Sequence, residues 1–223
     1  VRGIINRGGE QGAQHSQALH AWFAHVPGLR VVMPATPKDA RDLLIASVLC
    51  DDPVLYIDDR WLYEWTDEVG EPEELVLAEE GPKVVKQGKT LTLVTSSYCT
   101  KLALEAAGIL EKEGISLEVV DLRVINPIKF EPIRASVEKT RALIAVDSGW
   151  SSCGLAGEII ARVSEEFAPG YLNIAPSRIT IANTPAPTSR ALEENYFIST
   201  EKIVEHVRLA VQKIPSEISK QAI

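Results

Sequence analysis

The sequence has few cysteines, no long apolar run and no signal-peptide pattern at its start. Its three cysteines, Cys50, Cys99 and Cys153, are odd in number, lie far apart and form no CxxC or Cys/His cluster. We therefore expect neither a disulfide framework nor a structural zinc site, and the pattern is typical of a reducing, cytosol-like compartment. Since no apolar run approaches the length of a membrane span, we expect no membrane association.

Basic residues are also scarce. Acidic residues outnumber lysine and arginine, which gives a net charge of −8 at pH 7 over 223 residues. A nucleic-acid surface needs clustered basic side chains and the sequence has no basic stripe, so we expect no nucleic-acid partner. Hydrophobic residues make up 45% and charged residues 24%, as in globular proteins, and the length allows one large domain or two ordinary ones.

The chain opens on an apolar, β-branched stretch without an initiator methionine. Residues 1–5 read as a strand, and natural chains rarely begin inside a sheet. We therefore expect that an upstream segment is missing from this sequence.

Residues 1–58 alternate strand and helix patterns. Strands are predicted at residues 1–6, 29–33 and 54–57. A helix over residues 14–26 is predicted by apolar side chains at i, i+3, i+4 and i+7, namely Leu19, Trp22, Phe23 and Val26.

A second helix begins with Thr36 as N-cap and Pro37 at the first helical position. Its expected buried stripe is Ala40, Leu43, Leu44, Ser47 and Val48. So small a unit would bury only a marginal core and needs the rest of its sheet.

The remainder of the chain has two parts. Residues 59–88 are rich in charges and turn formers and are expected to form a connection. From residue 89 onward the alternation resumes, with strands expected at 90–95, 117–122, 142–146 and 178–181, and helices at 98–113, 130–139, 154–167 and after a cap at Thr200. This alternation predicts an α/β fold with parallel strands, right-handed crossovers and helices on both faces of the sheet.

Three loops are candidates for a site, because ligands of open parallel sheets bind beyond the carboxyl ends of the strands. They are residues 7–14, which lead into His15, residues 147–153, and residues 182–188. The first loop contains Gly8-Gly9-x-x-Gly12, which matches neither the dinucleotide nor the P-loop pattern, so a tight turn is the simpler interpretation.

His15 is the sharpest catalytic candidate. It follows the glycine-rich loop at the start of a predicted helix, and imidazole suits proton transfer or hydrogen bonding to a carboxylate or oxyanion. The alternative is a hydrogen-bonded interior histidine, because His15 lies four residues before Leu19 on the predicted buried face. His20, His25 and His206 have weaker claims, since nothing in their sequence setting gathers other polar groups.

A family resemblance becomes visible at residues 13–44, which read AQHSQALHAWFAHVPGLRVVMPATPKDARDLL. This stretch resembles the second half of the pyrimidine-binding domain in β subunits of thiamine-diphosphate-dependent 2-oxo acid dehydrogenases, closest to the pyruvate type. The resemblance continues through DDPVLYIDDRWLY, LEVVDLRVINPIKFEPI, ALIAVDSGW and ANTPAPTSRALEENY. It implies that residues 1–58 are the C-terminal half of that parallel-sheet domain, residues 59–88 a linker, and residues 89–223 a transketolase C-terminal-type α/β domain.

The resemblance also implies an activity and an assembly. The expected reaction is oxidative decarboxylation of a 2-oxo acid, with pyruvate favoured, followed by acyl transfer to lipoamide on an acyltransferase. Thiamine diphosphate is expected between this subunit and an α subunit that holds the diphosphate and magnesium, in an α2β2 heterotetramer. The location is expected to be cytoplasmic, or the mitochondrial matrix in a eukaryote.

Individual residues take roles only by this resemblance. His15 matches the family histidine that faces the substrate near the thiazolium, where it can bind the substrate carboxylate or assist reductive acylation. The segment around Ser47, Val48, Cys50 and Asp52 matches a potassium-binding loop built largely from backbone carbonyls.

The sequence departs from the family pattern in two respects. The loop before His15 is shorter than usual, and the glutamate that activates the pyrimidine belongs to the missing upstream part, since Glu10 is in the wrong place. Two alternatives stay open: a non-catalytic, truncated interaction module, and a ketol transferase of the transketolase class. The second is disfavoured because no Arg/His cluster suited to a sugar phosphate is visible.

Overall fold

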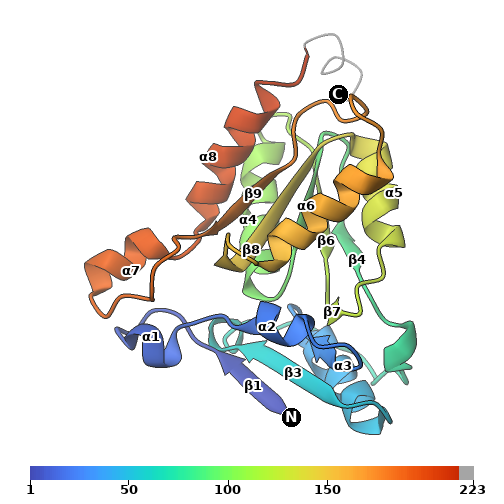
Figure 1. Ribbon diagram of the computed structural model, residues 1–223, viewed down its shortest axis with the longest axis vertical. Helices are drawn as coiled ribbons and strands as arrows, with labels where there is room; N and C mark the ends of the chain where they lie inside the picture. Colours follow the sequence, from blue (N-terminus) through green and yellow to red (C-terminus); the bar gives the residue numbers. More distant parts are fainter. Residues whose placement is uncertain (216–223) are drawn as a thin grey trace.

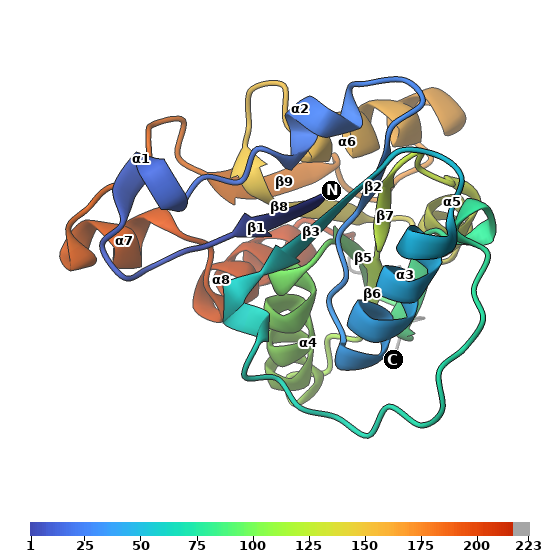
Figure 2. The same ribbon diagram turned by 90° about the horizontal axis from the view of Figure 1, so that it is seen from below.

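The computed structural model describes residues 1–215 as two α/β layers that follow each other along the long axis of the molecule (Figure 1). One sheet has four strands in the order β1-β3-β2-β7, and the other has five in the order β4-β6-β5-β8-β9. Seen from below, the four-stranded sheet lies across one end of the larger layer (Figure 2). The α/β class with largely parallel sheets is therefore confirmed.

The smaller sheet is parallel in its N-terminal part. Its strands are β1 (Arg2–Ile5), β3 (Val54–Asp59) and β2 (Arg30–Val32). Strand β3 is central: Arg2 pairs with Tyr56 on one side and Arg30 with Val54 on the other. The three strands expected here are confirmed, although β3 continues two residues further than predicted.

The fourth strand of this sheet comes from far along the chain and was not predicted. Strand β7 (Val124–Asn126) runs antiparallel to β2, with Val32 opposite Val124. The Asn126 side chain donates hydrogen bonds to the carbonyls of Val26 and Leu29, at 3.0 and 2.6 Å. The second half of the chain thus completes the sheet begun by the first half.

Helix α3 (Pro37–Leu49) covers one face of this sheet and begins as predicted. The Thr36 hydroxyl accepts a hydrogen bond from the Asp39 amide at 3.1 Å, and Pro37 occupies the first turn. The predicted buried stripe is wrong in part, because Leu44 and Val48 are exposed whereas Asp42 is buried. Asp42 tolerates burial because Arg41 and Lys38 bind its carboxylate; the Arg41 hydrogen bond contributes most to lowering its pKa to about 2, against the opposing effect of burial.

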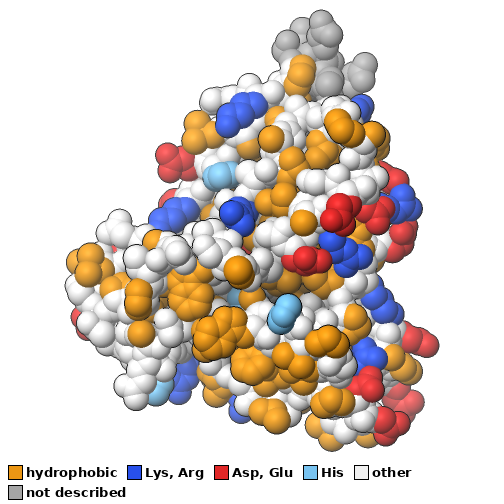
Figure 3. Space-filling model, viewed as in Figure 1, with side chains coloured by type: hydrophobic (Ala, Val, Ile, Leu, Met, Phe, Trp, Pro, Cys, Tyr) orange, Lys and Arg blue, Asp and Glu red, His pale blue; other side chains and the backbone are white. Residues whose placement is uncertain are grey.

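The single helix expected over residues 14–26 is wrong. Two short helices occupy this stretch, α1 (Gly12–His15) and α2 (His20–Ala24). In α2 the buried side chain is His20, whereas Trp22 and Phe23 are 70% and 40% exposed. Hydrophobic side chains consequently gather on the outer surface around α2 (Figure 3). The physical reason is that His20 bonds to the second layer, which turns the apolar face of α2 outward.

The larger sheet contains the strands β4 (Lys83–Lys86), β6 (Leu117–Asp121), β5 (Leu91–Thr95), β8 (Leu143–Trp150) and β9 (Ser177–Ile181). All neighbours pair in parallel except β4 and β6, which are antiparallel. Its helices are α4 (Tyr98–Glu111), α5 (Glu131–Thr140), α6 (Leu155–Glu166) and α8 (Thr200–Val211).

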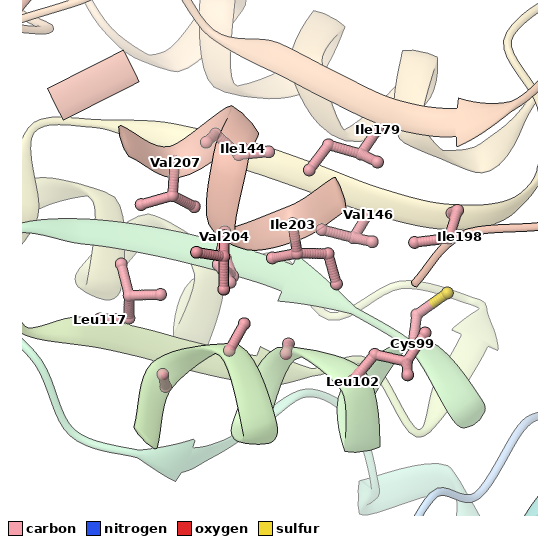
Figure 4. Close-up of a cluster of buried hydrophobic side chains, with 14 of the residues drawn as sticks. Cys99, Leu102, Leu117, Ile144, Val146, Ile179, Ile198, Ile203, Val204 and Val207 are labelled. Atoms are coloured by element: carbon pink, nitrogen blue, oxygen red, sulfur yellow. The ribbon is translucent and has the colours of Figure 1, made fainter. Parts of the chain in front are cut away.

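Hydrophobic clusters fill both faces of this sheet. On one face, Ile203 and Val207 of α8 lie against strand residues such as Ile144, with Leu102 of α4 in the same cluster (Figure 4). On the other face, α5 and α6 share a cluster with residues of the smaller sheet, including Ile5 and Met33. The two layers therefore share this second cluster, through which the smaller sheet buries its inner face against the larger layer.

Several elements differ from the prediction. Strand β8 continues through the expected turn at residues 147–150, because Trp150 still pairs with Ile181 of β9. Strand β4 and two short 3-10 helices lie within residues 59–88, and helix α7 (Arg190–Tyr196) was not expected. Helix α8 is capped by Ser199, not Thr200, since the Ser199 hydroxyl accepts from the Lys202 amide. Among the described residues, no helix combines the length and the apolar character needed to cross a bilayer.

Candidate active site

The three loops singled out in the sequence come together in space. Gly12 of the first loop has a φ of +59°, and a Cβ there would lie 2.5 Å from the Thr188 methyl group of the third loop. The Trp150 indole of the second loop donates a hydrogen bond to the Thr184 carbonyl of the third, at 2.9 Å. His20, shortly after the first loop, lies 2.8 Å from Asp147 of the second. The loops thus form one region between the two layers.

His15 is the last residue of α1, three positions after Gly12, and its side chain is exposed. Within residues 1–215 its ring forms no hydrogen bond, so both nitrogens are available to a ligand or partner. The exposure contradicts the interior alternative for His15. Its catalytic role stays a prediction.

His20 and Asp147 form a buried pair that the sequence did not reveal. The His20 side chain is 0% exposed and that of Asp147 3% exposed, and the pair joins residues 127 positions apart. The expectation that nothing polar gathers around His20 is therefore wrong. The possible signals were a histidine within the apolar stretch LHAWF and an aspartate at the end of an apolar strand, but neither names its partner.

Asp147 is satisfied from three sides. Besides His20, the backbone amides of Gly149 and Ala156 donate to its carboxylate at 2.9 and 3.1 Å. Burial alone would raise the pKa of Asp147, yet the charge and hydrogen bond of His20 and the two amides hold it below its usual value. Ala156 lies in the first turn of α6, whose N-cap is Gly154, so Asp147 also supplies the side-chain cap that Gly154 lacks.

A second buried pair lies where β1 and β3 end. Arg7 follows β1 and donates to Asp59, the last residue of β3, and both side chains are 5% exposed or less. The Arg7 guanidinium also lies 4.7 Å from the centre of the Tyr98 ring, while its Nε has no partner among the described residues. A cavity of about 690 Å³ opens beside it, bounded by the glycine-rich loop, Trp61 and the start of α8.

Glu10 borders this cavity but is engaged with α7. Its amide donates to the Glu193 carboxylate at 3.1 Å, and its own carboxylate accepts from the Arg190 amide at 3.2 Å.

The described residues fit only part of a thiamine diphosphate site. The exposed imidazole of His15 suits the substrate side of such a site. However, no group of three His, Cys, Asp or Glu side chains that could hold a metal ion occurs within residues 1–215.

The segment at residues 47–52 offers some of the ligands that a potassium ion needs. The last carbonyls of α3 lack helical partners, and carbonyl oxygens are suitable ligands for a hard cation. The Asp52 carboxylate, however, binds Arg30 at 2.7 Å, and the Ser47 hydroxyl donates to the Leu43 carbonyl at 2.6 Å. Val48 is exposed and offers only its main-chain oxygen, and Cys50 is partly buried.

Family models identify the class to which this fold and site belong. The transketolase pyrimidine binding domain matches residues 2–64, and the transketolase C-terminal domain matches residues 81–203. The chain therefore belongs to the transketolase family. A pyrimidine binding domain supports thiamine diphosphate as the expected cofactor.

Individual relatives show which members of this family the chain resembles. The chain is 38% identical to the mitochondrial pyruvate dehydrogenase E1 component subunit beta of Dictyostelium discoideum, over 91% of this chain and 57% of that protein. It is 37% identical to an acetoin:2,6-dichlorophenolindophenol oxidoreductase subunit beta of Cupriavidus necator, over 93% and 61%. The resemblance to β subunits of 2-oxo acid dehydrogenases is thus confirmed, and the chain spans less than two thirds of these relatives.

A solved structure supports the fold. The chain superposes on a split gene transketolase, described as an inactive beta4 tetramer, with a TM-score of 0.76 and 24% identity. The match covers 96% of this chain and 67% of that one. At this identity the likeness concerns the fold alone.

Proposed function

We propose that this chain is the C-terminal portion of the β subunit of a thiamine-diphosphate-dependent 2-oxo acid dehydrogenase, with pyruvate as the favoured substrate. The reaction is oxidative decarboxylation with transfer of the acyl group to lipoamide. The observation that carries the proposal is the exposed imidazole of His15, on the short helix whose first residue, Gly12, meets the third loop, in a chain 38% identical to a pyruvate dehydrogenase β subunit.

When bound, thiamine diphosphate supplies the electron sink that makes loss of carbon dioxide possible. The residues of this chain would position the substrate and transfer protons. One nitrogen of the His15 ring can donate a hydrogen bond to the substrate carboxylate or to an oxyanion, while the other accepts a proton, so the ring can pass a proton during acyl transfer. Because His15 is exposed, a lipoyl group presented from outside can reach it.

The proposed partners are an α subunit and a second β subunit in an α2β2 assembly, and a lipoyl acyltransferase. The relatives named as β subunits support an α partner, which would hold the diphosphate and magnesium. Apolar side chains exposed on α2 and α3, such as Trp22 and Val48, support subunit contacts. Potassium at the end of α3 belongs to the same proposal. So does the compartment, which is the mitochondrial matrix in a eukaryote and otherwise the cytoplasm.

Replacing His15 with Ala tests the catalytic role. In the complete β subunit assembled with its α subunit, we expect H15A to lower acyl transfer to lipoamide by about 100-fold or more, since general acid–base groups contribute that much. The circular dichroism spectrum and melting temperature should stay unchanged, because the side chain is exposed. His25, also exposed, provides the matched control H25A, which should keep wild-type rates. Equal kinetics of H15A and wild type would remove His15 from the site.

Substrate assays separate the remaining alternatives. Decarboxylation of 2-oxo acids by the assembled complex supports the proposal. Ketol transfer between sugar phosphates would instead identify a transketolase-class enzyme. Association with the α subunit without any turnover would identify a non-catalytic interaction module.

A further inference from the structure

We propose that His20 is a positioning residue, whose bond to Asp147 fixes the segment that carries His15. The inference deepens the proposed function, because it assigns the placement of His15 to a contact with the second layer. The anchoring of this segment can be measured without an activity assay.

The Asp147 end of the bond belongs to a rigid frame. Asp147 lies in β8, which pairs with β5 on one side and β9 on the other. The amides of Gly149 and Ala156 hold the same carboxylate, and Ala156 belongs to the first turn of α6. Displacing the carboxylate would therefore leave the first turn of α6 without its side-chain cap. A side chain bound to Asp147 takes its position from this frame.

The fit between His20 and this frame depends on Gly149. A Cβ at Gly149 would lie 3.3 Å from the Cε1 atom of His20 and 3.3 Å from the Asp147 carboxylate. The bare backbone of Gly149 therefore allows the ring to lie against the strand. Because the His20 side chain is 0% exposed, it cannot touch a substrate, and it acts through what it holds.

His15 is close to His20 along the chain. Four residues separate the two histidines, and Ser16 and Ala18 among them are buried. The connecting segment therefore has little freedom to move. On its other side, α1 is anchored where Gly12 meets Thr188 of the third loop. His15 is thus exposed between two anchors, and both of them lie on the C-terminal layer. Loss of the His20 anchor should let the His15 ring move away from a productive position.

The variant H20L removes the bond and leaves Asp147 with its two amide donors. In the full chain, we expect hydrogen–deuterium exchange of residues 12–19 to rise about tenfold, because the segment opens more often. In the assembled enzyme, kcat/KM for acyl transfer should fall about 10- to 100-fold, the cost of a displaced catalytic group. The variant H20Q keeps an N–H donor on the side chain and should recover much of both losses.

Two comparisons make the test specific. The matched control is H206L, which removes the 2.9 Å bond between His206 and Ser177 within the larger layer and should change neither readout. The double variant H15A/H20L should be no slower than H15A alone, because His20 acts only through His15. Additive losses in the double variant, or exchange of residues 12–19 in H20L equal to that in H206L, would overturn the proposal.

The two proposals can fail separately. If H20L raises the exchange of residues 12–19 while H15A leaves the kinetics unchanged, the anchor stands and the proposed role of His15 falls. If H15A is inactive but H20L behaves as wild type in both readouts, the role of His15 stands and the positioning role of His20 falls.

Discussion

Buried polar side chains in this molecule differ in how well they are compensated. Asp147 has three donors, whereas Asp121 at the end of β6 accepts a side-chain hydrogen bond from the Thr100 hydroxyl at 3.0 Å, and its second oxygen has no partner among the described residues. Burial raises the pKa of Asp121 to about 7, against the smaller lowering effect of Thr100. The folded protein therefore binds a proton at Asp121 more tightly than the unfolded chain does.

This difference predicts a pH-dependent stability. The contribution of Asp121 is fully present below its unfolded pKa of about 3.9 and is lost as the pH rises through about 7. The variant D121N removes the dependence, so its free energy of unfolding relative to wild type should increase by about 2 kcal/mol between pH 5 and pH 8. Urea titrations at the two pH values measure it.

Asp42 provides the control for this prediction. Its pKa is lowered to about 2, mainly by Arg41 and Lys38, so its stabilising effect is lost only as the pH falls below about 4. The change caused by D42N should therefore be the same at pH 5 and pH 8. A flat profile for D121N as well would contradict the assignment of a raised pKa to Asp121.

The site residues show what sequence can and cannot reveal at this scale. His15 was identified because it follows a glycine-rich loop and belongs to a recognisable stretch of the family. The pairs His20–Asp147 and Arg7–Asp59 were missed, since their members lie 127 and 52 positions apart and no local pattern links them. Their burial becomes favourable only after the chain has brought the partners together.

Among the elements, α3 has the clearest local signal, and its cap can be tested. The Thr36 hydroxyl satisfies the Asp39 amide at the start of the helix. Replacing Thr36 with Ala should lower the free energy of unfolding by about 1 kcal/mol, because one helical donor loses its partner. Denaturant unfolding measures the loss. The matched variant T36S keeps the hydroxyl and should stay within a few tenths of a kcal/mol of wild type, whereas equal losses in T36A and T36S would show that the cap is not the cause.

Local signals predicted the start of α3 and most strands, but they failed where long-range contacts decide. The apolar periodicity of Leu19, Trp22 and Phe23 predicted a buried helix face, but Leu19 precedes α2 and Trp22 and Phe23 are exposed, because periodicity cannot say whether the same chain covers an apolar face. Strand β8 was predicted to end before Asp147 because polar residues usually indicate a turn. It continues because Asp147 is satisfied within the structure and Trp150 pairs with Ile181.

At the scale of the whole molecule, the chain spans 57% of the pyruvate dehydrogenase β subunit of Dictyostelium discoideum that it resembles, and we propose that it supplies only the substrate side of a composite site. We therefore expect that the 223-residue chain alone does not bind thiamine diphosphate appreciably in the presence of magnesium. Titration calorimetry measures this, with the complete β subunit assembled with its α subunit as the positive control. Micromolar binding by the chain alone would contradict the division of the site between subunits.

The α/β class and the parallel order of most strands followed from the alternation of patterns along the chain. The partition at residues 58 and 88 stays a prediction. The sharing of elements between the two layers could not be predicted, because β7 has three residues and its pairing partner β2 lies more than ninety positions earlier.

The strand β7 has a consequence for how the molecule comes apart. Since it extends the N-terminal sheet from within the C-terminal half, a cut in the polypeptide between residues 64 and 81 would sever the covalent link but not the hydrogen-bonded ladder between β2 and β7. The N-terminal fragment would stay bound to the C-terminal fragment through this ladder. We therefore expect the two family domains to unfold together and not as separate units.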